Sequence, residues 1–155
     1  MGIDLVVTPQ EVWKFGTQER VARGTPIRLV GRVVNGVAES RYSRLLVPGA
    51  AAGYVVTAGR TLLLTRVVFR STVAAATWHL ISADAAVADN TLAAPAGEVA
   101  EDSVADQIGN AFISATANAI TVAEIYAEIA AARGVGVLGF TGSTSYFFNV
   151  YGVEV

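Results

Sequence analysis

At 155 residues the chain is long enough for one domain with a full hydrophobic core, and no second domain is needed. It is 53% hydrophobic and 15% charged, yet no apolar run reaches the roughly 18 residues that a membrane span requires, which excludes a transmembrane helix. The absence of cysteine excludes disulfide scaffolds, thiolate metal sites and cysteine nucleophiles. This unusually apolar composition indicates that part of the surface contacts a partner.

The net charge of −2 conceals an uneven distribution of charge along the sequence. Residues 14–70 contain ten basic and two acidic residues, whereas residues 71–132 contain eight acidic residues and no Lys or Arg. The two halves either neutralise each other within one fold or present complementary potentials to partner molecules. Nucleic acid is not an expected partner, because the arginines of 26–34 lie in strand-like sequence without a recognition helix or an RNA-binding aromatic signature.

Short β-branched segments bounded by Gly or Pro recur along the chain, which is typical of antiparallel strands in a sandwich or barrel. The expected strands are 4–8, 26–34, 44–47, 53–57, 61–70, 76–82, 110–116, 135–141 and 144–155. They predict a mainly β fold, an antiparallel β-sandwich or barrel, in a single domain over 26–155.

The segment 61–70 is expected to be a central, half-buried strand, because its side chains alternate between apolar and basic. Leu63, Val67 and Phe69 are predicted to share one face, and Arg66 and Arg70 the other.

Two connections carry distinct signals. Asn35-Gly36 lies between apolar runs and predicts a hairpin turn. Residues 83–107 are rich in Ala, acidic and poor in aromatics, which predicts a long exposed excursion over the fold. Long loops in compact domains are usually functional, and the function expected here is contact with a partner.

One segment departs from the β pattern. The four residues from Thr121 match a capping box, and apolar side chains follow from Val122 at i, i+3, i+4 and i+7. Arg133 and Gly134 then supply a basic last turn and a left-handed cap, so a short helix is predicted over 122–132. The competing prediction is a strand, because alternate residues from Thr121 onward also form one apolar face.

The chemical motifs favour a binding protein over an enzyme. Residues 134–139 fit G-x-G-x-x-G, but a dinucleotide site needs a strand before the glycines and a helix after them, and here the order is reversed. No G-x-S-x-G elbow exists, and the single histidine, His79, follows Trp78 in an apolar segment typical of packed residues. The acidic residues Glu98, Glu101, Asp102 and Asp106 fit no EF-hand spacing. We therefore expect no catalytic residue, metal ligand, cofactor or small-molecule substrate.

The last segment, 144–155, places bulky rings on both faces of one strand. Tyr146, Phe148 and Val150 point one way, and Phe147, Asn149 and Tyr151 the other. Such a strand must be covered twice, either by a second layer of its own domain or by neighbouring subunits.

Two stretches, which make up 22 of the 155 residues, resemble small jelly-roll proteins of tailed phages. Residues 52–65, AGYVVTAGRTLLLT, resemble an opening in which tyrosine and valine precede proline-alanine-glycine-lysine and a strand. Ala58 stands where the proline is usual. Residues 148–155, FNVYGVEV, are similar to the final strand of the same proteins.

The resemblance implies a jelly-roll-like domain on the surface of a virion, most like a capsid decoration (cement) protein assembled in the host cytoplasm. Such proteins form homotrimers on the major capsid protein and reach neighbours with N-terminal arms, a role that residues 1–25 would take here. The expected partner-binding residues are Trp13, Phe15, Arg20, Arg23, Arg41, Arg44, Tyr146, Phe147 and Tyr151.

Two other classes of function remain open from the sequence. A phage tail or fibre protein, or another carbohydrate- or receptor-binding module, would use exposed aromatics such as Trp13, Tyr42 and Trp78 as flat platforms. A small β-barrel enzyme would need a pocket where His79 meets a carboxylate and a hydroxyl.

Overall fold

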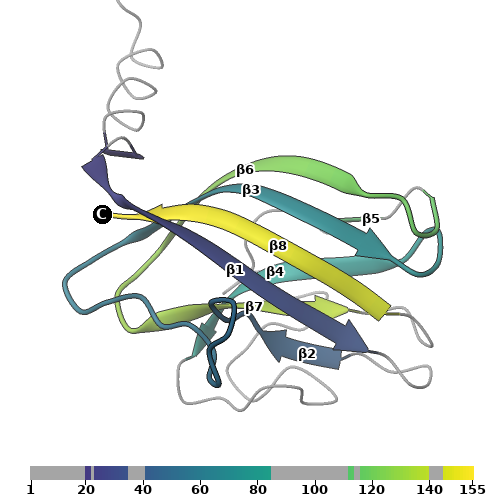
Figure 1. Ribbon diagram of the computed structural model, residues 1–155, viewed down its shortest axis with the longest axis horizontal. Helices are drawn as coiled ribbons and strands as arrows, with labels where there is room; N and C mark the ends of the chain where they lie inside the picture. Colours follow the sequence, from purple (N-terminus) through teal and green to yellow (C-terminus); the bar gives the residue numbers. More distant parts are fainter. Residues whose placement is uncertain (1–19, 22, 35–40, 85–111, 114–115, 140–144) are drawn as a thin grey trace, which may run out of the picture.

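The protein is an antiparallel β-sandwich (Figure 1). The computed structural model describes residues 20–21, 23–34, 41–84, 112–113, 116–139 and 145–155. The strands are β1 (Thr25–Val34), β2 (Arg41–Arg44), β3 (Leu62–Ser71), β4 (Thr77–Asp84), β5 (Phe112–Ile113), β6 (Thr121–Ile129), β7 (Arg133–Gly139) and β8 (Ser145–Glu154).

The two sheets have four strands each, in the orders β1-β8-β3-β6 and β2-β7-β4-β5. This is the strand order of an eight-stranded jelly roll, in which two Greek keys wind the chain between the sheets. The predicted mainly β sandwich is therefore confirmed. The segment predicted to be a central strand is β3, which pairs with β8 on one side and β6 on the other.

Aromatic rings from both sheets fill the space between them. Trp78 of β4 is fully buried, and its ring meets Phe69 of β3 and Phe148 of β8 edge-on, with centroid distances of 4.6 and 4.7 Å. Tyr146 is also fully buried, and its hydroxyl donates a hydrogen bond to the Thr77 carbonyl at 3.1 Å. Edge-to-face pairs stabilise such a core beyond the burial of apolar area.

The register of β3 shifts between Leu64 and Arg66, and this corrects one predicted face. Val67 and Phe69 belong to the core cluster and Arg66 is exposed, as expected. Leu63 is buried but lies outside the core cluster. The irregularity inserts one residue into the alternation, so Leu63 falls on the opposite face from Val67.

The helix predicted over 122–132 is wrong, because Thr121–Ile129 forms the edge strand β6. Burial alternates along it, with Ile125 packed against the core and Tyr126 exposed. Seven residues of this segment pair with β3, and this pairing overrides the local helical signal. The expected left-handed cap at Gly134 also moves, because Ala132 takes the positive φ of 64° in the turn before β7.

The hairpin turn predicted at Asn35-Gly36 lies outside the described residues, and the strands on either side of it, β1 and β2, belong to different sheets. β1 pairs along its whole length with β8, and its contact with the chain after β2 is one bridge between Val30 and Leu46. The predicted strand 53–57 is not a strand, but Val56 bonds to the backbone of the β6–β7 turn and closes one end of the sandwich.

Other predictions fall wholly or partly outside the described residues. The strand 4–8, the excursion 85–107 and most of the arm 1–25 lie outside the described residues. Within the arm, Arg20, Val21 and Arg23 are helical and come directly before β1. In the part of 110–116 that is described, the strand is limited to the two residues of β5.

Candidate functional site

The outer face of the sheet β1-β8-β3-β6 carries four arginines around two aromatic rings. Its residues are Arg28 and Arg32 of β1, Phe147 and Tyr151 of β8, and Arg66 and Arg70 of β3. They share this face because side chains alternate along a strand, and Val150 and Phe148 of β8 point into the core. We call this surface the basic face.

The first row of the basic face is centred on Tyr151. In the register of the sheet, Tyr151 is opposite Arg28 on β1 and opposite Arg66 on β3. The Cζ atom of Arg66 lies 4.4 Å from the centroid of the Tyr151 ring, which is the geometry of a cation–π contact. The ring is half-buried, whereas both arginines are exposed.

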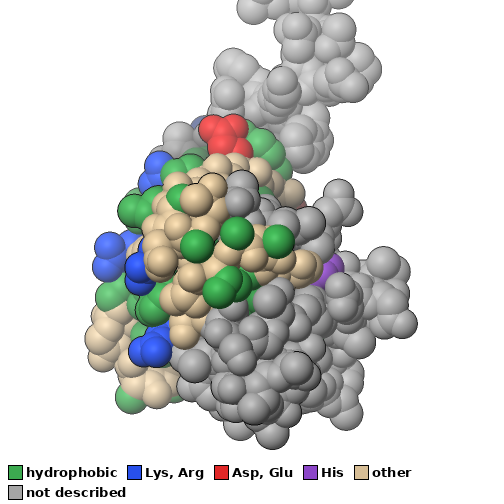
Figure 2. Space-filling view, turned by 90° about the vertical axis from the view of Figure 1, so that its right-hand side faces the viewer, with side chains coloured by type: hydrophobic (Ala, Val, Ile, Leu, Met, Phe, Trp, Pro, Cys, Tyr) green, Lys and Arg blue, Asp and Glu red, His purple; other side chains and the backbone are tan. Residues whose placement is uncertain are grey.

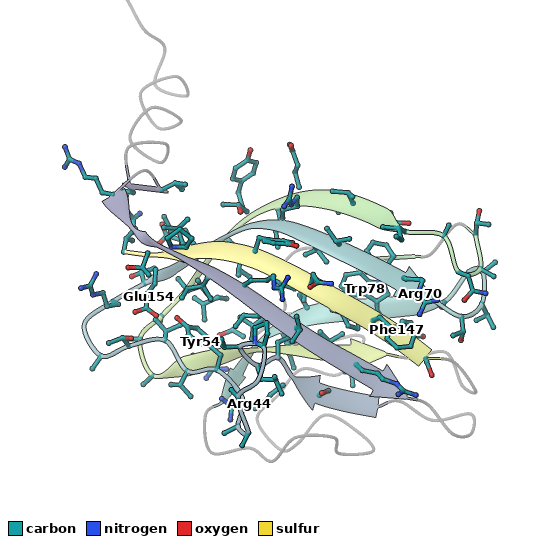
Figure 3. The ribbon with its side chains drawn as sticks, viewed as in Figure 1. Arg44, Tyr54, Arg70, Trp78, Phe147 and Glu154 are labelled. Carbon is teal, nitrogen blue, oxygen red and sulfur yellow. The ribbon has the colours of Figure 1, made fainter. Side chains whose placement is uncertain are left out.

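The second row is centred on Phe147, and both flanking guanidinium groups contact its ring. The Cζ atoms of Arg32 and Arg70 lie 5.4 and 4.5 Å from the ring centroid. Figure 3 shows Arg70 beside Phe147 at one end of β8. Arg70 also donates a hydrogen bond to the Asn118 side-chain oxygen at 3.5 Å. The second face of β8 is therefore covered by arginines of its own sheet.

A neutral row separates the two charged rows. It consists of Val30, Asn149 and Val68, which are opposite one another in the sheet. Since Phe147 and Tyr151 are four residues apart on one strand, the two charged rows are about 13 Å apart.

Three of the four arginines have no acid opposite them among the described residues, whereas Arg66 is opposite Glu124 of β6 in the register of the sheet. The ion pair found in the described part of the chain joins Arg20 to Glu128, at 2.7 Å, and none of the four arginines lies within 4.0 Å of a described carboxylate. Figure 2 shows Arg side chains gathered along one side of the molecule, with hydrophobic side chains between them. Such a surface attracts an anionic partner.

The edge of the same sheet has the opposite charge. The outward side chains of β6 include Glu124, Tyr126 and Glu128, which we call the acidic edge. Tyr126 is 71% exposed. β6 is an outermost strand, and within the described residues no strand pairs with its far side.

A second polar cluster lies at the opposite end of β8 and is buried. The Tyr54 hydroxyl donates a hydrogen bond to the Glu154 carboxylate, to which the Thr57 backbone N–H also donates at 3.4 Å. Burial alone would raise the pKa of Glu154, but these hydrogen bonds and the charge of Arg60 outweigh it and hold the pKa below its ordinary value. Burial and the carboxylate raise the pKa of Tyr54 well above its ordinary value.

Arg44 belongs to the interior near this cluster. Its Nη2 donates to the Tyr54 carbonyl at 3.0 Å, and the side chain passes between two glycines. A Cβ on Gly53 would lie 2.9 Å from Arg44 Cζ, and one on Gly134 would lie 2.5 Å from the Tyr54 carbonyl oxygen. Gly134, the first glycine of the G-x-G-x-x-G match, therefore lies near the start of β7 and leaves room for the Arg44 side chain.

The structure places some of the predicted partner-binding residues on the surface and others in the interior. Phe147 and Tyr151 lie on the basic face, and Arg20 and Arg23 are exposed before β1. Arg44 and Tyr146 are 6% and 0% exposed, so these two are corrected: they hold the interior together and are not available to a partner. The structure does not describe Trp13, Phe15 or the side chain of Arg41.

The structure also shows where some of the residues considered for ligand binding and catalysis lie. Trp78 is fully buried and cannot act as a flat platform, and Tyr42 has no described side chain. His79 is packed, with 5% of its surface exposed. In the described part of the chain there is no group of three acidic or histidine residues arranged to hold a metal ion. That part also contains no helix long and apolar enough to cross a membrane.

Sequence reasoning named the two rings of the basic face but missed its four arginines as a site. Arg28 and Arg32, like Arg66 and Arg70, are four residues apart in strand-like sequence, so each pair was readable as one face. The pairing of both strands with β8, which brings the arginines to the rings, depends on register between segments about 80 to 120 residues apart and leaves no local signal.

Comparisons with known proteins identify no family for this chain. No family model matches the sequence, and no curated protein is similar to it. Among solved structures, the Eiger TNF of S. frugiperda matches 83% of this chain and 92% of its own, with a TM-score of 0.35 and 9% identity. The K1 cleaved adhesin domain of Lys-gingipain from Porphyromonas gingivalis W83 matches 84% and 96%, with a TM-score of 0.30 and 12% identity.

Proposed function

We propose that this chain is a structural protein that works by assembly, docking its basic face against an acidic protein surface. The observation that carries this proposal is the pair of rows in which arginines flank Phe147 and Tyr151. Only Arg66 has a described acid, Glu124, opposite it, and no described carboxylate lies within 4.0 Å of any of the four arginines. Arginine and aromatic residues are the side chains most enriched at protein interfaces and at their energetic centres.

The chemistry of the basic face favours protein over single-stranded nucleic acid. Proteins that bind single strands stack bases on aromatic rings. Here guanidinium groups already lie over the rings of Phe147 and Tyr151, so the ring faces are occupied. The guanidinium groups instead offer planar donors, which match carboxylates in two-bonded geometry.

The more specific form of the proposal is a decoration protein of a tailed-phage capsid, acting as a homotrimer on the major capsid protein. The resemblance of 52–65 and 148–155 to phage jelly-roll proteins supports it. The jelly-roll strand order is compatible with it, since viral capsid domains are among the proteins that use this fold. The chain would then act on the virion surface without catalysis or a cofactor.

Cosedimentation with empty capsids tests this proposal. The capsids are assembled from the major capsid protein of the phage or prophage whose genome encodes the chain. We expect wild type to cosediment and the double variant Arg32→Gln, Arg70→Gln to bind about tenfold more weakly, because roughly 1.4 kcal/mol of contact free energy is lost. Rising salt should weaken wild type more than the variant.

The matched control is Arg60→Gln, which removes one exposed positive charge from the turn 57–60, outside the basic face. It is compared with the single variant Arg32→Gln. Equal binding by all variants would overturn the role of the basic face. Failure of wild type to bind capsids at low salt would overturn the role in the capsid, and the same assay with purified tails then tests the tail or fibre placement.

A further inference from the structure

The acidic edge repeats the spacing of the basic face. Glu124, Tyr126 and Glu128 occupy positions i, i+2 and i+4 of β6, so two carboxylates lie about 13 Å apart with an exposed ring between them. On the basic face, two arginine rows are also about 13 Å apart, with Val30 and Val68 in the neutral row between them.

We propose that the basic face of one copy of this chain binds the acidic edge of a second copy. Glu124 and Glu128 of one copy each face an arginine row of the other, and Tyr126 covers the neutral row. The inference rests on the proposed function, because it takes the basic face as the docking surface and names its acidic occupant. Both halves of the contact are on this chain, and their charges are complementary.

The arrangement of the two surfaces makes the contact head-to-tail. Two basic faces packed on each other would oppose arginines to arginines, and the repulsion between like charges disfavours that contact. The arginines lie on β1 and β3 and the acids on the outermost strand β6 of the same sheet, where Glu124 is opposite Arg66 of its own chain. Contacts between different surfaces of identical subunits close into rings when the rotation allows.

Glu128 can change partners at little cost. In one chain its carboxylate is paired with Arg20, and both side chains are about half exposed, at 46% for Arg20 and 63% for Glu128. Exposed ion pairs of this kind contribute little to stability. An arginine row of a second copy therefore competes with Arg20 on nearly equal terms.

Engineered cysteines test the contact without background, because the chain has none of its own. One variant carries Tyr126→Cys and another carries Val68→Cys, and the two are mixed under mild oxidation. Within one chain Val68 is opposite Val122, four residues and about 13 Å from position 126, too far for an internal disulfide. We expect the mixture to form a covalent pair at least about tenfold faster than either variant alone, because binding raises the effective concentration.

Two controls give this result its specificity. Ile120→Cys replaces Tyr126→Cys at a position of equal exposure, 73% against 71%, that lies six residues away along the same segment, and it should not react with Val68→Cys. Adding Glu124→Gln and Glu128→Gln to the Tyr126→Cys variant should slow cross-linking, as should high salt. Circular dichroism confirms that each variant is folded, and Val30→Cys replaces Val68→Cys if that variant is not.

The alternative outcomes separate this inference from the proposed function. Cross-linking of Tyr126→Cys with itself, or no cross-linking in any folded mixture, overturns the face-to-edge contact. If capsid binding still depends on Arg32 and Arg70, the basic face then meets the capsid directly and the proposed function stands. Cross-linking together with failure of wild type to bind capsids gives the reverse result: self-assembly stands and the capsid role fails.

Discussion

Tyr54 and Glu154 join the segment after β2 to the last strand through a hydrogen bond to a buried carboxylate. We predict that Tyr54→Phe lowers the free energy of unfolding at pH 7 by about 1.5–3 kcal/mol, the usual contribution of a hydrogen bond to a charged group. Urea unfolding at pH 7 measures the change. Tyr151→Phe, which removes a hydroxyl from the basic face, should change the stability much less.

The same pair predicts how stability depends on pH. The pKa of Glu154 is lower in the folded chain than in the unfolded one, so its contribution is full above the unfolded pKa and is lost as pH falls through the folded pKa. The difference between wild type and Glu154→Gln should therefore shrink between pH 7 and pH 3. The pKa of Tyr54 is raised, so its contribution is lost as pH rises above 10. A constant difference across the acid range would contradict the hydrogen-bonded carboxylate.

Ala132 has a φ of 64° in the turn between β6 and β7, a conformation that costs a residue with a Cβ roughly 1 kcal/mol. We predict that Ala132→Gly stabilises the protein by up to about 1 kcal/mol, measured as a higher midpoint of thermal unfolding. The neighbouring Ala131→Gly has no positive φ to relieve and should leave stability unchanged or lower. Equal effects at both positions would contradict this turn geometry.

At the scale of single residues, the sequence predicted what alternation alone decides. The two faces of the last strand were assigned correctly, with Phe148 in the core and Phe147 outside it. Burial of Arg44 was not predictable, because it depends on Gly53 and Gly134, which approach from other parts of the fold. Sequence alone indicates that an arginine is present, but not which distant glycines make room for it.

The strand β6 gives the sharpest test at the scale of elements. In a helix Ile125 and Tyr126 would share the buried face, but in β6 Ile125 packs on the core and Tyr126 is exposed. We predict that Ile125→Asn destabilises by about 1–3 kcal/mol, since it buries a polar group, whereas Tyr126→Asn stays within about 0.5 kcal/mol. Comparable losses in chemical denaturation would favour the helix.

The wrong helix shows where local sequence stops being decisive. Residues 121–132 satisfy both a 3.6-residue and a two-residue apolar period, so either element buries an apolar face. The strand prevails because β3 offers it a partner along Leu62–Phe69, a contact that no local pattern reports. The pairing of the strand before Asn35-Gly36 was hidden for a related reason, since β1 finds its partner in β8 at the far end of the chain.

For the whole molecule, composition and spacing were enough to predict a single β-sandwich but not its candidate site. The uneven charge of the sequence becomes two surfaces of one sheet, the basic face on β1, β8 and β3 and the acidic edge on β6. Which strands stand side by side is set by pairing across the whole chain. The sequence could therefore indicate complementary charges without indicating where they lie.

The central claim is that the basic face is an assembly surface for a second copy, and the solution mass of the wild-type chain tests it most directly. Sedimentation equilibrium over a range of concentration and salt gives that mass. We predict a multiple near three times 16.1 kDa at low salt that falls toward the monomer as salt rises, because screening weakens the contact between arginines and carboxylates. A monomer at every concentration and salt, or an oligomer indifferent to salt, would contradict the claim.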